Sequence, residues 1–230
     1  MRGWAALALV LASCASSGDP SARFTGGGLP AGDYGVPVQS VLEQRFSGVV
    51  RQRFDFSCGS AALATLLRHH YGYDVGEEQA FRGMWMRGDR AQIRKVGFSL
   101  LDMKRWLESR RLVANGYRVP LDELAKAGVP GIALITLRNY RHFVVVKGVR
   151  GDEVLLGDPS AGIVVMPRAD FLKAWNGVYF ILVEDQPRAR RAFNRGDQWA
   201  AFVRAPIGST FSDPVSQQSL ALSAPQYGDI

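Results

Sequence analysis

Apolar residues in the first half of the chain recur with the period of helices. Residues 57–72, SCGSAALATLLRHHYG, carry their alanines and leucines on one helical stripe, and the glycine at their end is typical of a helix stop. Residues 76–86 and 99–111 predict two further helices, and residues 121–128 predict a short one. Residues 40–55 alternate enough to predict strands or an extended segment.

The period changes in the second half, where short apolar runs alternate with turn residues. Strands are predicted at 131–137, 142–149, 153–159, 162–167 and 178–185, with a short helix at 169–177. Helices that precede a largely antiparallel sheet are typical of the α+β class. We therefore expect an α+β fold in which N-terminal helices pack on a C-terminal antiparallel sheet.

The chain begins like an exported protein. Residues 1–13 combine a positive start with an apolar run too short to span a membrane, as in a secretory signal peptide. Cys14 directly follows this run, which resembles the lipidation site of bacterial lipoproteins; an ordinary signal peptide is the alternative. Several acyl chains on Cys14 would form a stable membrane anchor. Ala15 follows instead of aspartate, so the resemblance implies no retention in the inner membrane, and we expect a periplasm-facing lipoprotein of the outer membrane.

Composition divides the rest of the chain into three parts. Residues 14–40 are rich in Gly, Ser, Pro and Ala, as in flexible linkers. Residues 41–186 carry the patterned segments and form one domain. Residues 187–230 form a basic tail with Pro and Ser, in which five Arg face one Asp up to Arg204. We favour a disordered tail, and attachment to an anionic surface is the alternative.

The net charge adds little to this picture. The chain carries a formal charge of +7 and has a sequence pI of about 9.7. Basic residues are dispersed, without a run of five and without a nucleic-acid motif, so we expect no nucleic-acid binding. A content of 47% hydrophobic and 21% charged residues fits a globular monomer.

Cys58 stands at the head of the helix predicted at 57–72. The chain has 2 cysteines, so lipid on Cys14 would leave Cys58 without a disulfide partner. Cys58 is then either a buried inert residue or a thiol kept for chemistry. A helix N-terminus and a nearby histidine both favour the nucleophilic thiolate, and Gly59 would let a substrate backbone approach.

The chain offers three histidines as partners of this thiol. His69 lies eleven residues along the same helix, about 16 Å from Cys58, so neither it nor His70 reaches the sulfur. We expect both at a solvated helix end. His142, at the entry of the strand predicted at 142–149, is the remaining candidate base.

Asp158 lies at the outer end of the next predicted strand, across a turn at 151–152. A two-residue turn would pair Asp158 with Val145, and a longer loop would pair it with Phe143, beside His142. Both place the two residues at one end of the hairpin. The carboxylate would then orient the imidazole towards the thiol, although Asp-Pro is also a common turn opener.

Gln52 precedes Cys58 by six residues. Acyl transfer develops negative charge on the substrate carbonyl oxygen, and a side-chain amide together with the nucleophile's backbone N–H stabilises it. A surface glutamine is the alternative interpretation. This chemistry needs neither a cofactor nor a metal, and we expect none.

Four stretches resemble, in this order, the bacteriocin-processing double-glycine cysteine peptidases, a papain-like family: RQRFDFSCGSAALATLL, GFSLLDMKRWLESRRL, NYRHFVVVKGV and EVLLGDPSAG. The resemblance covers about residues 46–185. It implies that Cys58 is the nucleophile and His142 the base. It also implies that Asp158 orients the base and that Gln52 binds the oxyanion. The family cleaves after a Gly-Gly pair at the end of a leader peptide.

The sequence departs from this family in two ways. Many members have Asp directly before the cysteine, where this chain has Ser57. Most are domains of peptide-exporting ATPase transporters, whereas this sequence has no transmembrane segment after Cys14 and no GxxxxGK[ST] loop. It is more similar to the stand-alone exported members, some of which accompany functional-amyloid secretion systems.

We therefore expect a cysteine endopeptidase that cleaves a leader or secreted polypeptide in connection with secretion-system components. A peptidase-like module that binds a secretion substrate without cutting it is one alternative. Another papain-like acyl transfer, such as transglutamination or amide hydrolysis, would use the same residues.

Overall fold

The computed structural model describes residues 21–24, 34–37, 40–54, 56–137 and 140–200. The predicted signal peptide, Cys14 and the chain after residue 200 lie outside the described residues. The first of two units, 1–41, contains strands β1 (Ser21–Phe24) and β2 (Tyr34–Pro37), which pair antiparallel. This pairing differs from the flexible linker expected at 14–40.

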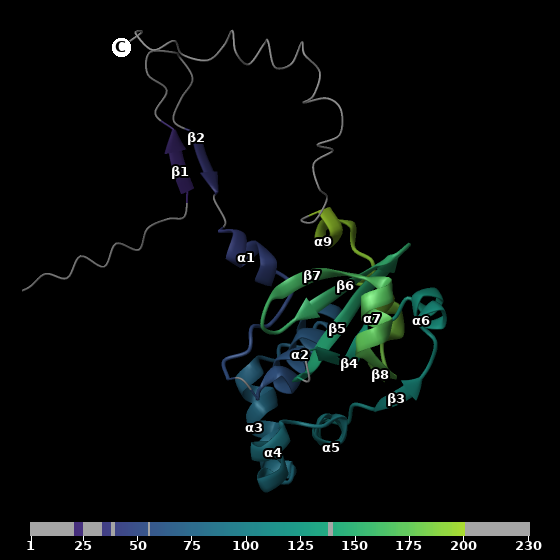
Figure 1. The fold of residues 1–230 in the computed structure, drawn as a ribbon. Coiled ribbons are helices and arrows are strands. Elements are labelled where there is room, and N and C mark those ends of the chain that lie inside the picture. The colour runs from purple at the N-terminus through teal and green to yellow at the C-terminus, as the bar shows by residue number, and fades with distance from the viewer. Residues whose placement is uncertain (1–20, 25–33, 38–39, 55, 138–139, 201–230) are drawn as a thin grey trace, which may run out of the picture. The chain divides into compact units, whose positions relative to one another are not determined.

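The second unit, 42–230, opens with helices (Figure 1). They are α1 (Val41–Phe46, which begins at the unit boundary), α2 (Cys58–Leu66), the π-helix η1 (Leu67–Tyr71), α3 (Glu77–Arg87), α4 (Arg90–Val96) and α5 (Leu100–Ser109). Gly72 ends η1 in the left-handed conformation, at φ 71°, as expected. Ser99 and Asp102 form a capping box that starts α5.

The strands form one six-stranded antiparallel sheet in the order β3-β8-β4-β5-β6-β7. Its members are β3 (Ala114–Arg118), β4 (Gly131–Leu137), β5 (Tyr140–Arg150), β6 (Glu153–Asp158), β7 (Gly162–Pro167) and β8 (Trp175–Leu182). Helix α6 (Leu121–Ala127) joins β3 to β4, and α7 (Arg168–Ala174) joins β7 to β8. The α+β prediction is confirmed.

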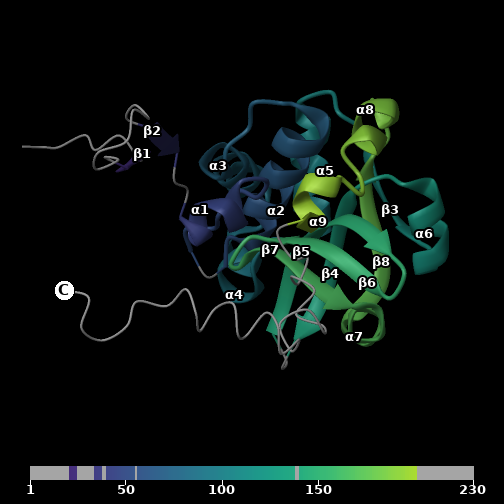
Figure 2. The same cartoon turned by 90° about the horizontal axis from the view of Figure 1, so that it is seen from above.

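Helices cover both faces of the sheet (Figure 2). Phe143 and Val145 of β5 join the core formed with α2, α3 and α5. Val144 and Val146, which alternate with them, join a second core with Phe171 of α7 and with α6. A strand buried on both faces explains why this stretch is continuously apolar in sequence.

Two predictions about local structure are wrong. The stretch 40–55 was expected to be extended, but its first part is the helix α1, whose Leu, Glu, Gln and Arg are good helix formers. The tail was expected to be disordered from residue 187, but α8 (Gln186–Arg191) and α9 (Gly196–Ala200) are ordered parts of the fold. Ala189, Phe193 and Trp199 are buried there. These apolar residues are too sparse among the arginines to produce a recognisable period.

Candidate active site

Cys58 is the first residue of α2, and its side chain is 8% exposed. It lines a cleft of about 420 Å³ together with Phe98, Leu134 and Phe143. Gly59 allows close packing, and the substrate approach expected for it stays a prediction. A Cβ there would lie 3.1 Å from both Met103 and Phe98, so the glycine lets α2 sit tightly on its neighbours.

His142 on β5 meets Asp158 at the end of β6. His142 Nε2 lies 2.8 Å from Asp158 Oδ1, and the imidazole is almost fully buried. The same carboxylate oxygen accepts hydrogen bonds from the Ser160 hydroxyl, 2.6 Å away, and from the backbone N–H groups of Ser160 and Ala161. Asp158 therefore both closes the turn that follows β6 and holds the imidazole.

A β-bulge sets the register that makes this contact. Arg150 lies opposite Glu153, so the strands are joined by the two-residue turn. The pairing shifts by one residue at Lys147, and beyond this point Val145 lies opposite Gly157. The next position, Asp158, thus comes opposite Val144 instead of Val145 or Phe143. A shift of one residue changes the face to which a side chain points, so the bulge brings Asp158 onto the face of Val144 and His142.

The electrostatics of His142 link it to both partners. Burial lowers its pKa, but the hydrogen bond with Asp158 and the interaction with Cys58 outweigh burial and raise the pKa to about 9. Within the described part of the chain, His142 Nδ1 makes no hydrogen bond of regular geometry, although the Cys58 interaction places the thiol near the imidazole. Burial likewise opposes the ionised form of Asp158, but its hydrogen bonds with His142 and Ser160 hold its pKa below the ordinary value. The imidazole is therefore protonated at neutral pH.

The backbone of Gln52 is hydrogen-bonded to the turn that follows Asp158. Its backbone N–H donates to the carbonyl of Pro159, the residue after Asp158, at 2.9 Å. Its side-chain Oε1 is buried and has no hydrogen-bond partner among the described residues. The four candidate residues of the sequence thus converge: Cys58 and Asp158 both interact with His142, and Gln52 is tied to the turn that carries Asp158.

The other two histidines lie elsewhere. His70 is not solvated, as was expected of it, but 2% exposed, with Nε2 lying 3.0 Å from the Nζ of Lys147. His69 beside it is half-buried. Both belong to η1 at the far end of the α2 helix, so the separation from Cys58 expected for them is correct.

A model of the peptidase C39 family matches residues 47–188, more than half of the chain and the whole of this site. The chain belongs to the peptidase C39 family. The resemblance to double-glycine peptidases noted in the sequence is thereby confirmed.

Two relatives of this C39 chain are each named "Probable functional amyloid protease FapD". The protein from Pseudomonas fluorescens is 45% identical and that from Pseudomonas aeruginosa is 42% identical, each over 146 residues. The match covers 64% of this chain and 65% of each relative, so it spans just under two thirds of their length.

The fold has a counterpart among solved structures. The peptidase domain of Streptococcus ComA, a bifunctional ABC transporter involved in a quorum-sensing pathway, aligns with a TM-score of 0.50 at 20% identity. The alignment covers 59% of this chain and 96% of that domain. This likeness concerns the fold, and it confirms the papain-like arrangement expected for the C39 chain.

Within the described residues, no helix combines the length and apolar character needed to cross a bilayer.

One residue of the C39 site was not found from the sequence. Glu77, the first residue of α3, is 6% exposed, and its Oε1 lies 2.5 Å from the hydroxyl of the fully buried Ser57. The same oxygen accepts a hydrogen bond from the backbone N–H of Arg53 at 3.0 Å. Ser57 takes the position where many members have Asp, and here the carboxylate behind the nucleophile loop comes from Glu77 instead. The sequence signal, an acid in the first turn of a helix, is too common to indicate this contact.

Proposed function

We propose that this C39 chain is a cysteine endopeptidase that cleaves a polypeptide exported by its cell. The observation that carries the proposal is the position of His142, whose imidazole interacts with the Cys58 thiol and lies 2.8 Å from Asp158. A thiol that contacts an imidazole, which in turn contacts a carboxylate, is the arrangement used for nucleophilic acyl transfer.

The proposed reaction proceeds in two steps. The Cys58 thiolate attacks the carbonyl carbon of the scissile peptide bond, and its own backbone N–H and the Gln52 amide stabilise the oxyanion. His142 donates its proton to the leaving amine as the carbon–nitrogen bond breaks, which leaves a thioester on Cys58. His142, neutral again and held by Asp158, removes a proton from water, which hydrolyses the thioester.

The substrate proposal rests on the relatives. Both FapD proteins are named as functional amyloid proteases, so we assign the substrate of this chain to the secreted or leader-bearing polypeptides of a functional-amyloid export system. Cleavage after a Gly-Gly pair is the specificity that the double-glycine family supplies. The components of that export system are the partners that the proposal implies.

The proposed location is the periplasmic side of the outer membrane, with lipid on Cys14 as the anchor. The motif at residues 1–14 supports this proposal. In cell fractionation, the native chain should sediment with outer membranes, and Cys14→Ser should move to the soluble fraction. Recovery of Cys14→Ser with the membranes would contradict a lipid anchor at this residue.

The activity is tested with two synthetic peptides, one with an internal Gly-Gly pair and one in which Ala-Ala replaces it, followed by mass spectrometry. Wild type should cut after the pair in the first peptide. Cys58→Ala and His142→Ala should lower kcat/KM by at least about 1000-fold. His69→Ala, which changes a histidine outside the site, should retain activity.

Three outcomes of this assay would revise the proposal. Cleavage of both peptides at equal rates would keep the peptidase and remove the Gly-Gly specificity. Binding without cleavage by wild type would instead establish the peptidase-like binding module. Transfer of the peptide acyl group to an added amine, in the absence of hydrolysis, would establish another papain-like acyl transfer.

A further inference from the structure

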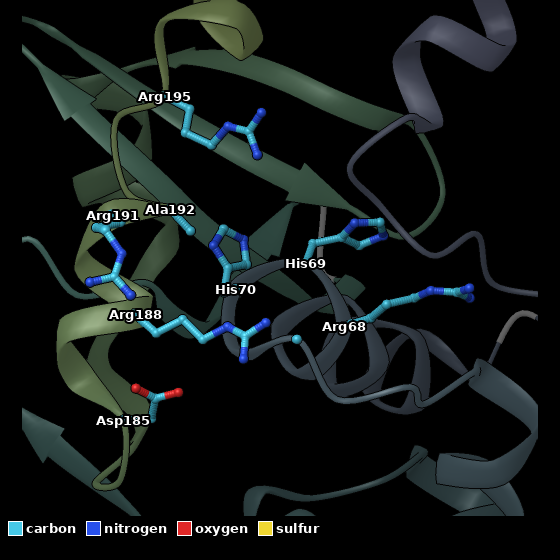
Figure 3. A pocket seen from close by; sticks show the side chains of 9 residues that line it. Arg68, His69, His70, Asp185, Arg188, Arg191, Ala192 and Arg195 are labelled. Atoms are coloured by element: carbon cyan, nitrogen blue, oxygen red, sulfur yellow. The ribbon is translucent and has the colours of Figure 1, made fainter.

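A second cleft, of about 570 Å³, shares no lining residue with the cleft at Cys58, and its side chains are drawn in Figure 3. It is bounded by the end of η1, by α8 and by the chain that leads from α8 to α9. His69 in its lining belongs to η1, roughly 16 Å from Cys58 along α2 and η1. The peptidase reaction proposed above makes no use of this cleft.

Arginines dominate the lining of this basic cleft. Arg68 comes from η1, Arg188 and Arg191 come from α8, and Arg195 follows α8, whereas Asp185 is the single carboxylate among the residues that line it. Figure 3 shows the side chains of Arg188, Arg191 and Arg195 near the imidazole of His70, whereas the side chain of Arg68 extends away from it. A cleft with this balance of charge has a strongly positive potential.

The fold neutralises these arginines only in part. Arg195 donates two hydrogen bonds to the carboxylate of Asp197, at 3.0 and 2.7 Å, and Arg68 lies 3.7 Å from Asp74. The guanidinium groups of Arg188 and Arg191 make neither an ion pair nor a hydrogen bond with any residue that the structure describes. They are therefore available to a ligand.

The two histidines of the cleft respond to this field. Burial first, and then the charges of Lys147, Arg68 and Arg195, lower the pKa of His69 to about 4. Burial and the charge of Lys147 hold the pKa of His70 well below its ordinary value. His70 Nδ1 is buried near the Ala192 backbone without a hydrogen bond of regular geometry to a described residue. Both rings are neutral at pH 7. They offer ring nitrogens to a ligand, but they carry no negative charge that could balance the arginines.

Gly72 shapes the cleft at the end of η1. A Cβ at this position would come within 1.9 Å of Arg188 Nη2, so the guanidinium lies directly against the backbone of Gly72. The residue also has φ 71°, which glycine adopts without strain. The helix stop that the sequence indicated therefore also makes room for an arginine of the cleft.

We propose that the basic cleft binds a phosphate group, with Arg188 and Arg191 as its main ligands. A guanidinium presents paired N–H donors that match two oxygens of a phosphate. The surplus of arginines over carboxylates favours a dianion over a single carboxylate. Free phosphate or a phosphomonoester and the headgroup of an anionic phospholipid share this chemistry.

The first test titrates the full chain carrying Cys14→Ser with inorganic phosphate at constant ionic strength, followed by calorimetry and by the thermal midpoint. Phosphate should bind and should raise the midpoint. The double variant Arg188→Gln/Arg191→Gln should weaken binding at least tenfold while its midpoint without phosphate stays unchanged. Arg190→Gln is the matched control, because Arg190 is on the same helix but does not line the cleft, and it should bind phosphate like wild type.

The second test distinguishes the two sources of the phosphate group. Vesicles of phosphatidylglycerol, compared with vesicles of phosphatidylcholine, should retain the protein only if the cleft accepts a lipid headgroup, and the double variant should then be released. Retention on neither kind of vesicle, together with binding of inorganic phosphate, assigns the cleft to a soluble phosphate compound.

Three results would overturn the proposal. These are an equal response to chloride, an equal loss in Arg190→Gln, and tighter binding of a polyglutamate peptide than of phosphate. Each would reduce the cleft to diffuse surface charge or to a site for acidic peptides. Cys58→Ala should bind phosphate normally, so failure of this proposal and failure of the proposed peptidase activity are separate results.

Discussion

His142 shows how the surroundings of one side chain prepare it for chemistry. Burial alone would leave the imidazole neutral, and a neutral imidazole could not protonate a leaving amine. Asp158 and Cys58 reverse the effect of burial and raise the pKa to about 9. The proton that the proposed first step needs is therefore on His142 before substrate arrives.

This pKa predicts the alkaline side of the pH profile. The value of kcat/KM should fall as pH rises through about 9, because His142 then loses its proton. Asp158→Asn removes the charge that favours imidazolium, so the fall should move to lower pH. The measurement is kcat/KM of both proteins with one peptide substrate between about pH 6 and pH 10. An unchanged alkaline limb in Asp158→Asn would contradict the role given to the carboxylate.

The four residues that the structure brings together at the candidate site could be named from the sequence, whereas their geometry could not. Cys58, His142, Asp158 and Gln52 stand in recognisable stretches at recognisable offsets. The bulge at Lys147 that sets the register leaves no sequence signal, because the sequence does not show whether a lysine in an apolar strand is buried or exposed. The contact of Ser57 with Glu77 joins the residue before α2 to the first residue of α3 and depends on the packing of the two helices, so it was missed.

At the scale of elements, strand β5 carries two titratable side chains with opposite behaviour. His142 is raised from its ordinary pKa of 6.5 to about 9. Burial first, and then the charge of Arg195, lowers the pKa of Lys147 from 10.5 to about 7. The Lys147 ammonium donates to the carbonyl of Gly48 at 2.9 Å and lies beside His70, so it connects β5 to the chain before α2 and to η1.

The two groups should make opposite contributions to stability as pH rises. Folded His142 keeps a proton that the unfolded chain releases above pH 6.5, so its stabilisation is complete below 6.5 and is lost as pH rises through about 9. Folded Lys147 has released a proton above about pH 7 that the unfolded chain holds up to 10.5, so stability rises over that interval.

Two variants separate these contributions between about pH 7 and pH 9. His142→Gln leaves the lysine, so its free energy of unfolding should rise with pH. Lys147→Met leaves the histidine, so the free energy should fall. Each slope should stay below about 1.4 kcal/mol per pH unit, the limit for one proton. Urea unfolding at several pH values measures both, and parallel curves for the two variants would contradict the assignment.

The predictability of the elements followed their length and composition. The helices at 57–72, 76–86 and 99–111 and the apolar strands of the sheet were predicted, because each carries a sustained period. The elements missed were short or polar: α1 has 6 residues, α4 has 7, and β3 reads ANGYR, which contains poor strand formers. Such elements form because neighbours pack on them.

At the scale of the whole molecule, the helices after β8 complete the fold of the second unit. Asn194 donates its backbone N–H to the carbonyl of Lys147 at 2.8 Å and its side-chain amide to Val149. The Trp199 ring is buried under the guanidinium of Arg150. The family model ends at residue 188, so this last layer lies mostly beyond the shared part of the C39 fold.

Truncation measures what this layer contributes. A chain that ends at Gln186 loses the buried side chains of Ala189, Phe193 and Trp199, so its free energy of unfolding should fall by roughly 3 kcal/mol or more. A chain that ends at Ala200 keeps these contacts and serves as the control. Urea unfolding compares the two, and equal stabilities would show that α8 and α9 add nothing to the unit.

The order of the site residues along the chain has a practical consequence. Gln52 and Cys58 come before the exposed stretch at Arg110 and Arg111, whereas His142 and Asp158 come after it. A break at that point yields two fragments, each with half of the four candidate residues, so by the proposed mechanism neither fragment should hydrolyse a peptide alone. Joined to two interacting proteins, the fragments would regain turnover only on reassembly. The layered architecture thus offers a split-enzyme reporter of association.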